Sequence, residues 1–325
     1  MTRAARPAVG LGAACGDGSG TTVARVRSAV RRLVALDAEQ GATAAMEGVR
    51  ETLREVPELT APPVSLTGLG GDLLAALAEL TEVIGWILFD AGLPRHAHRA
   101  NLRALALAER AGDRWTARLV LLNHSMLGAY AGQPRAALES AARVVGARPL
   151  PARVDSLVLI RQAHATALLG GHDETLRLLS RARGRFLDGL SRHDPPWAWW
   201  IDETELLGHR GWVLARLRQW DRAVPLLYEA ATAPGPSYRH LFGAELLSAL
   251  VGAGAWREAE GLIEDLAPRA ARIGSVRTTE RLGGTARATR AHTAAPARLR
   301  DAAAYLLDSL PASAAGTSSP NPRYR

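Results

Sequence analysis

Five turns at intervals of about forty residues constrain the fold of this chain more than any other feature of its sequence. At each turn a helix-like run ends, and a small or apolar residue follows five positions later. A recurrence in this range is typical of stacked helical hairpins. Such a stack builds a concave surface that holds a ligand or partner, and does no chemistry by itself. The pairs are Gly92/Ala97, Gly132/Ala137, Gly171/Leu176, Arg218/Ala223 and Gly254/Ala259, and the turns lie 40, 39, 47 and 36 residues apart.

Composition favours helix over sheet, because Ala, Leu and Arg dominate the 325 residues and aromatic residues make up only 5%. We therefore predict an all-α fold, a right-handed superhelix of stacked helical hairpins of the tetratricopeptide-like α-solenoid type. The predicted domains are a disordered segment over residues 1–20, a helical-repeat domain over residues 21–310 and a disordered tail over residues 311–325. Within the repeat domain we expect a long helix over residues 197–217, a short one over 276–282 and a loose linker over 283–297.

The net charge of +8 is unevenly distributed. Residues 267–325 hold ten arginines against three acids, whereas the rest of the chain holds 30 arginines against 29 acids. The repeat body is therefore nearly neutral, which is a weak basis for nucleic-acid binding, and a basic end more often keeps a protein soluble. No lysine occurs, which we interpret as the coding bias of a GC-rich actinobacterial genome.

Cys15 is the only cysteine, so an intrachain disulfide and a cysteine-based metal cluster are both excluded. No apolar stretch reaches the length of a membrane span, and residues 1–20 lack the apolar core of a secretory signal. We therefore expect a cytoplasmic protein with no membrane partner. Phosphate loops, nucleophile elbows and glycine fingerprints are also missing, so no cofactor or catalytic residue is predicted.

The spacing of small and large apolar residues follows the tetratricopeptide pattern, in which small residues sit where two helices cross closely. Residues 204–235 show it best, with Gly211 on the first helix and Ala223 and Ala230 on the second. The chain also resembles, more specifically, the C-terminal sensor domain of actinobacterial Xre-type helix-turn-helix transcriptional regulators. The stretches that carry this resemblance are residues 26–37, 79–86, 89–92, 194–203, 254–260 and 273–278.

The resemblance implies a domain that senses an effector or dimerises beneath a DNA-binding head. Such regulators begin with a helix-turn-helix domain, and residues 1–20 cannot form one. We therefore expect the head to be missing here, to be encoded elsewhere, or the domain to have taken an independent role. DNA would then be contacted only indirectly.

Residues 194–209 are the richest candidate for a binding site. Trp197, Trp199 and Trp200 could form an aromatic wall for a planar or cationic ligand. Alternatively, they are wedges that fill the space between neighbouring hairpins. Asp202, Glu205 and His209 are spaced to share one helical face, and they could hold a divalent metal, act as an acid–base cluster or form an exposed polar stripe.

Three further polar residues lie on helix positions that normally face inward. His124 and His164 are expected there either as buried neutral imidazoles or as ligand contacts, and Asn123 adds a donor and an acceptor beside His124.

The leading hypothesis is a non-enzymatic module that binds a protein partner or a small-molecule effector in transcriptional regulation or signalling. A homodimer is compatible with this hypothesis. The alternative is a stand-alone repeat domain recruited as a biosynthetic enzyme, acting on a metabolite at residues 197–205. A third possibility, direct DNA binding through the basic C-terminal end, has the least support.

Overall fold

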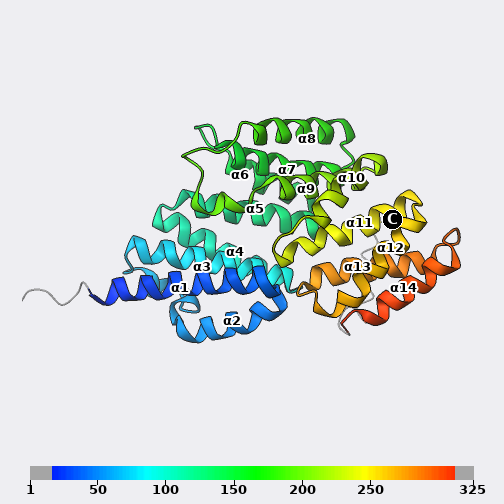
Figure 1. The fold of residues 1–325 in the computed structure, drawn as a ribbon. Helices are drawn as coiled ribbons and strands as arrows, with labels where there is room; N and C mark the ends of the chain where they lie inside the picture. The colour runs from blue at the N-terminus through cyan, green and yellow to red at the C-terminus, as the bar shows by residue number, and fades with distance from the viewer. Residues whose placement is uncertain (1–16, 312–325) are drawn as a thin grey trace, which may run out of the picture.

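The computed structural model describes residues 17–311, which form fourteen α-helices and five 3₁₀ helices and contain no strand (Figure 1). The all-α prediction is confirmed. No helix in these residues is long and apolar enough to cross a membrane. The α-helices are α1 (Asp17–Gln40), α2 (Ala42–Glu55), α3 (Gly71–Asp90), α4 (Pro94–Ala111), α5 (Arg114–Tyr130), α6 (Pro134–Val144), α7 (Ala152–Leu168), α8 (His172–Leu187), α9 (Glu203–Arg216), α10 (Trp220–Thr232), α11 (His240–Ala253), α12 (Trp256–Leu266), α13 (Val276–Ala291) and α14 (Ala297–Ser309). The 3₁₀ helices are η1 (Pro57–Leu59), η2 (Pro63–Leu66), η3 (Pro196–Trp200), η4 (Ser237–Arg239) and η5 (Ala267–Arg272).

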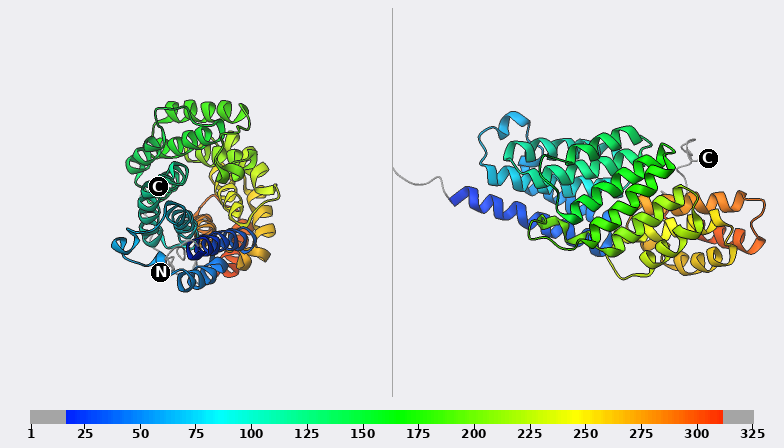
Figure 2. Two further views of the ribbon diagram at one scale, coloured as in Figure 1. Left: turned by 90° about the vertical axis from the view of Figure 1, so that its left-hand side faces the viewer. Right: turned by 90° about the horizontal axis from the view of Figure 1, so that it is seen from above.

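The helices form an inner and an outer row. Each odd-numbered helix from α3 to α13 contacts the next odd-numbered one, and α13 contacts α3, so the inner row closes on itself. The even-numbered helices pack outside, as burial shows: α7 has eleven buried residues and α8 only four. In the view with the helices end-on, the chain runs around a circuit in which α1 and α2 lie beside the last helices (Figure 2, left).

The turns within the hairpins, between the first and the second helix, follow the sequence pattern at four of five places. Gly92, Gly132, Arg218 and Gly254 adopt the left-handed conformation, with φ between 59° and 76°. Such a residue ends a helix and reverses the chain, and glycine adopts the conformation without steric cost. The alanines five positions after these turns are all fully buried, because the second helix of each hairpin crosses the first closely there: Ala97, Ala137, Ala223 and Ala259.

The third turn is displaced by one residue from its predicted position. Gly170, with φ of 79°, is the left-handed residue, whereas Gly171 has an ordinary φ of −76°. The residue five positions later is therefore Thr175, which is fully buried, and not Leu176. Two adjacent glycines satisfy the local pattern equally well, so the choice between them depended on packing.

Two predicted elements near the candidate site and the C-terminus are wrong. The long helix expected over residues 197–217 is broken, because Ile201 and Asp202 separate η3 from α9. The linker expected over residues 283–297 is helical as far as Ala291, since α13 buries Leu282 and Ala286 against the core. At the N-terminus, α1 begins at Asp17, inside the segment predicted to be disordered. Residues 1–16 and 312–325 lie outside the described residues.

The closure of the circuit of helices depends on a backbone contact and a buried ion pair. Gly41, at the α1–α2 turn, meets Gly274 so closely that a Cβ atom on Gly274 would lie 2.0 Å from the carbonyl oxygen of Gln40. On the neighbouring face, Nε of Arg277 in α13 donates to Oδ1 of Asp90 in α3 over 2.9 Å, and both side chains are buried. A larger residue would not fit where Gly41 and Gly274 meet. Their contact joins the two ends of the circuit.

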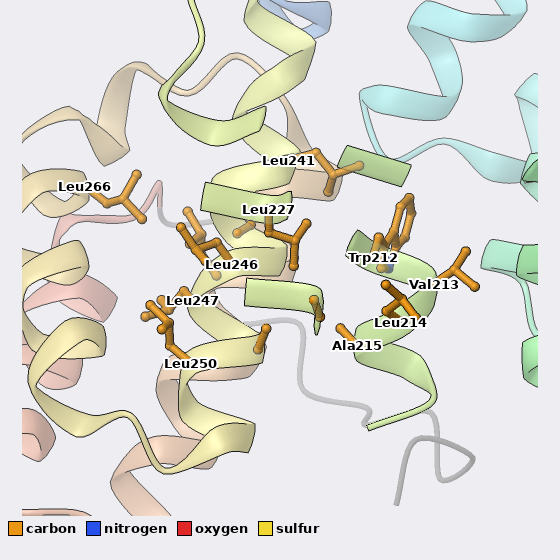
Figure 3. Packing of buried hydrophobic residues seen from close by; sticks show 14 of the residues in the cluster. Trp212, Val213, Leu214, Ala215, Leu227, Leu241, Leu246, Leu247, Leu250 and Leu266 are labelled. Carbon is orange, nitrogen blue, oxygen red and sulfur yellow. The ribbon is translucent and has the colours of Figure 1, made fainter. Parts of the chain in front are cut away.

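The hydrophobic core is divided along the circuit. One cluster joins α1, α2, α3 and part of α4, a second lies around α4, α5 and α7, and the largest extends from the end of α3 to α14. Figure 3 shows part of the largest cluster, where Trp212 of α9 and Leu227 of α10 pack beside leucines of α11. Apolar contacts with neighbouring helices thus hold the inner helices in place.

Candidate functional site

The inner helices enclose a cavity of about 550 Å³. Its walls come from α1, α3, α5, α7 and α9 together with η3 and η4, so residues far apart in the sequence meet there. This volume lies within the range of sites that bind small molecules, roughly 300–1,000 Å³. The cavity is therefore the candidate functional site.

Aromatic rings form one part of the lining, and η3 supplies three of them. Pro195 and Pro196 restrict the backbone where η3 begins, and a 3₁₀ helix has three residues per turn. Trp197 and Trp200 therefore share a side, where both pack against the cluster around α5 and α7. The six aromatic residues in the lining are Trp86, Trp115, Trp197, Trp199, Trp200 and Tyr238.

The tryptophans differ in how firmly the protein holds them. Nε1 of Trp197 donates to the backbone oxygen of Trp115 over 3.2 Å, which fixes the position of its ring. Trp199 is 63% exposed although it lines the cavity. Glu79 in the same lining is also exposed, so these two residues mark where the cavity opens to solvent.

Carboxyl groups form the second part of the lining, at Asp37, Glu79, Glu82, Asp113 and Glu205. Asp113 is occupied as the N-cap of α5, where it accepts hydrogen bonds from the backbone of Trp115 and Thr116. Oε1 of Glu82 accepts a hydrogen bond from Nδ2 of Asn123 over 2.6 Å. Oδ1 of Asp37 and Oε2 of Glu205 are buried without a hydrogen-bond partner among residues 17–311.

Burial changes the protonation of two of these acids. Desolvation raises the pKa of Asp37 to about 7; repulsion from Asp90 adds to the rise, whereas Arg277 and a hydrogen bond from Trp86 oppose it. Desolvation also raises the pKa of Glu82 to about 7, against the hydrogen bond from Asn123. Both carboxyl groups therefore titrate near neutral pH.

Arg161 of α7 is the one cationic side chain in the described lining. It is buried, and its Nη1 lies 3.4 Å from Nε2 of His209. Burial lowers the pKa of Arg161 to about 10, and the carboxylate of Glu205 limits the shift. The guanidinium remains charged at neutral pH, at the boundary between the cavity and the residues behind it.

A closed polar cluster lies behind Glu205, on the side away from the cavity lining. Nε2 of His209 is 3.2 Å from Oε1 of Glu205, and its Nδ1 is 3.0 Å from Nε2 of His164. The distances fit a neutral His209 that donates to Glu205 and accepts from His164. Trp212 stacks on His209 and meets His164 edge-on. Burial lowers the pKa of both histidines, which keeps them uncharged.

The structure brings five of the nine predicted site residues to the cavity: Trp197, Trp199, Trp200, Glu205 and Asn123. The other four lie elsewhere. Asp202 caps α9 through the backbone nitrogen of Glu205 and pairs with Arg239 over 2.6 Å. His164 and His209 belong to the closed cluster.

His124 does not reach the cavity lining, contrary to its predicted inward position. Its ring lies 5.4 Å from that of His98 in α4. Burial and the neighbouring His98 lower the pKa of His124 to about 4. His124 therefore takes part in packing between α5 and α4.

The metal site considered for Asp202, Glu205 and His209 is not formed. Asp202 precedes α9 in an extended conformation, so the three residues do not share a helical face. Glu205 and His209 instead contact each other directly. In the part of the chain that the structure describes, no group of three His, Cys, Asp or Glu side chains is arranged to hold a metal ion.

Apart from Asp113, whose carboxylate caps α5, sequence reasoning missed seven residues of the lining that carry charge or an aromatic ring. Four of them, Asp37, Glu79, Glu82 and Trp86, lie within the stretches 26–37 and 79–86 that carry the family resemblance. For Glu79 and Glu82, the available signal was an acid inside the otherwise apolar helix α3. The remaining three, Trp115, Arg161 and Tyr238, had no local signal, because only tertiary packing turns them toward the cavity.

Comparison with known proteins assigns no family to this geometry. No family model matches the chain, and no curated protein sequence matches it at a significant level. The function is therefore argued from the cavity.

Proposed function

We propose that this chain is a non-enzymatic, tetratricopeptide-like helical-repeat module that binds a small molecule in its central cavity and acts in transcriptional regulation or signalling. The observation that carries the proposal is the 550 Å³ cavity lined by six aromatic rings and five carboxyl groups. A cavity of this size lined with buried, unpaired polar atoms is costly for a protein that only needs to fold.

The repeat pattern supports the tetratricopeptide-like part of the proposal. The hairpins share left-handed turns and a fully buried small residue five positions later. Three stretches that carry the resemblance to Xre-type sensor domains, residues 26–37, 79–86 and 194–203, also converge on the cavity. Some of the residues behind the resemblance would thus contact a ligand.

A residue of the cavity lining also contacts the ion pair that closes the circuit of helices. A ligand in the cavity could therefore influence the whole domain. Trp86 lines the cavity, and the guanidinium of Arg277 lies 5.3 Å from its ring centroid. Arg277 in turn pairs with Asp90 across the α3–α13 contact. A ligand that packs on Trp86 would favour the closed circuit of helices, in which α13 contacts α3. A DNA-binding head or partner protein would respond to this closed state.

The experiment that tests ligand binding compares the unaltered protein with a variant whose cavity is blocked. Ala38 in α1 lines the cavity, and Ala38→Trp should fill part of it. Ala136→Trp on the exposed side of α6 is the matched control. Native mass spectrometry of protein purified from its source cells should detect a bound small molecule in the unaltered protein and the control, but not in Ala38→Trp. Equal retention by all three would contradict the proposal.

A second candidate function is catalysis on a metabolite held at the same site. The pKa values of Asp37 and Glu82, each about 7, suit a general base at neutral pH. Incubation of the protein with its identified ligand separates the two functions. Recovery of unchanged ligand supports binding, and a product whose formation stops in Asp37→Asn supports catalysis.

A further inference from the structure

We propose that the ligand of the cavity is an organic cation, a protonated or quaternary amine on an apolar body. This inference rests on the proposed function and names the chemical class of its ligand. It follows from the charge of the lining, from buried oxygen atoms without partners, and from the aromatic faces around them.

Carboxyl groups outnumber cationic groups in the lining by five to one. Asp113 is occupied by capping α5, and Glu205 contacts His209 and Arg239, which leaves three carboxyl groups, those of Asp37, Glu79 and Glu82, to face a ligand. Arg161 is the one opposing cation of the described lining, and it lies close to Glu205 and His209. An anionic ligand would therefore meet mostly like charge, whereas a cation would meet opposite charge.

Two of these acids have an oxygen atom that accepts no hydrogen bond, although Nε of Arg239 lies 3.6 Å from Oε2 of Glu205. Asp37 is only 7% exposed and Glu205 only 8%, and both line the cavity. Within the described residues, Oδ1 of Asp37 and Oε2 of Glu205 accept no hydrogen bond. A buried carboxyl group is unfavourable without a donor or a positive charge beside it. An ammonium group in the cavity would supply both to Oδ1 of Asp37.

The aromatic rings favour the same ligand. A cation is attracted to the face of a tryptophan within about 6 Å, and the protein already uses this interaction near the cavity. Arg118 lies 4.7 Å from the ring centre of Trp115, and Arg277 lies 5.3 Å from that of Trp86. In the described part of the chain, no arginine stacks on the three tryptophans of η3. The parts of these rings that line the cavity remain for a ligand cation.

The test uses two sets of compounds in which only the charge changes. Tyramine, tyrosol and 4-hydroxyphenylacetate share an aromatic body and are cationic, neutral and anionic, respectively. Choline, 3,3-dimethylbutan-1-ol and 3,3-dimethylbutanoate form the corresponding alkyl set. Isothermal titration calorimetry of the full chain should show the cation of each set binding about tenfold or more tightly than its neutral counterpart, with the anion weakest.

Variants assign the effect to the cavity. Asp37→Asn and Trp199→Ala should each weaken the binding of the cations by about tenfold. Because Trp199 is exposed, its variant stays folded even if Asp37→Asn does not. Glu139→Gln and Tyr305→Ala are matched controls, since both side chains are exposed and lie outside the lining, and they should bind as the unaltered protein does.

The outcomes separate this inference from the proposed function. Equal or tighter binding of the neutral or anionic compounds would overturn the cation and leave ligand binding standing. Failure of all six compounds to bind at millimolar concentration would also overturn it, because carboxyl groups and aromatic faces in this number should hold a simple cation. Cation binding that is unchanged in Ala38→Trp would place the site outside the cavity and contradict the proposed function instead.

Discussion

Glu205 lies between two buried polar regions that are built in opposite ways. On one side, Oε1 contacts His209, which contacts His164, and Trp212 packs on both rings. On the other side, Glu205 lines the cavity, where its Oε2 accepts no hydrogen bond in the described chain and lies 3.6 Å from Nε of Arg239. The first region is a closed cluster of mutually satisfied groups, and the second is open.

The difference shows what each region contributes. Mutually satisfied polar groups in a packed core stabilise one structure and need nothing further. Carboxyl groups that face a cavity lower the stability of the fold unless something binds them. The closed cluster therefore stabilises the packing of α7 against α9. The cavity lowers the stability of the fold and provides a place for binding. The predictions below test this contrast, from the largest expected effect to the smallest.

Two tryptophan replacements should differ most. Trp212 is buried in the closed cluster, so Trp212→Ala should lower the free energy of unfolding by about 3–5 kcal/mol through lost packing and a new cavity. Trp199 is largely exposed, so Trp199→Ala should change it by less than about 1 kcal/mol. Urea unfolding followed by circular dichroism measures both. Similar losses would remove the distinction between a packed region and a binding region.

The two regions should respond to pH with opposite sign. The folded state of Asp37 has a pKa of about 7 against 3.8 for the free group, so the folded state holds a proton that the unfolded state has lost. Its contribution to stability is greatest below about pH 4 and falls as the pH rises to 7. The buried His164 has a pKa well below 6.5, so its contribution is lost as the pH falls below 6.5 and the unfolded state takes up a proton.

Two variants separate these contributions. Relative to the unaltered protein, Asp37→Asn should gain stability on going from about pH 5 to about pH 8, on the order of a few kcal/mol. His164→Gln should gain in the other direction, as the pH falls below 6.5. Denaturant unfolding at a series of pH values gives both slopes. Parallel slopes for the two variants would show that the regions do not differ in protonation.

Added volume should be tolerated in the cavity and not in the packed core. Ala163 in α7 is fully buried beside His164, so Ala163→Phe should cost about 1–3 kcal/mol by overpacking. Ala38→Trp adds an even larger side chain, but into the cavity, and should cost less than about 1 kcal/mol. Thermal unfolding compares the two. A large loss in Ala38→Trp would mean that the space beside α1 is not available to a ligand.

The smallest effect on binding is expected at Asp202, which the sequence placed in the site and the structure places at the start of α9. Asp202→Ala should cost about 1 kcal/mol, because it removes the cap of α9. Binding of tyramine should remain unchanged, since Asp202 does not line the cavity. A loss of binding comparable to that of Asp37→Asn would make Asp202 part of the site.

Local features were the most predictable part of the fold. The ends of most helices follow from residues within one turn, such as Pro94 and Pro134 at the first helical positions and Gly254 in the left-handed conformation after α11. Predictions failed where tertiary packing decided between local options. Gly170 rather than Gly171 forms the third turn, and the glycine-rich and threonine-rich residues 283–291 are helical because one face of α13 is buried.

The candidate site was predictable only in part, for the same reason. The tryptophans of η3 are close together in the sequence, so their number alone pointed to a site. Asp37, Glu82 and Arg161 lie on α1, α3 and α7, and nothing in their neighbourhoods shows that they face one space. The sequence by itself determined the helices, most of their turns and the aromatic segment, because a few adjacent residues set these through backbone conformation and hydrogen bonding. The tertiary structure alone decided that the row of helices closes through Gly274 and Arg277 and surrounds an acidic cavity, because that arrangement depends on contacts between residues more than 180 positions apart.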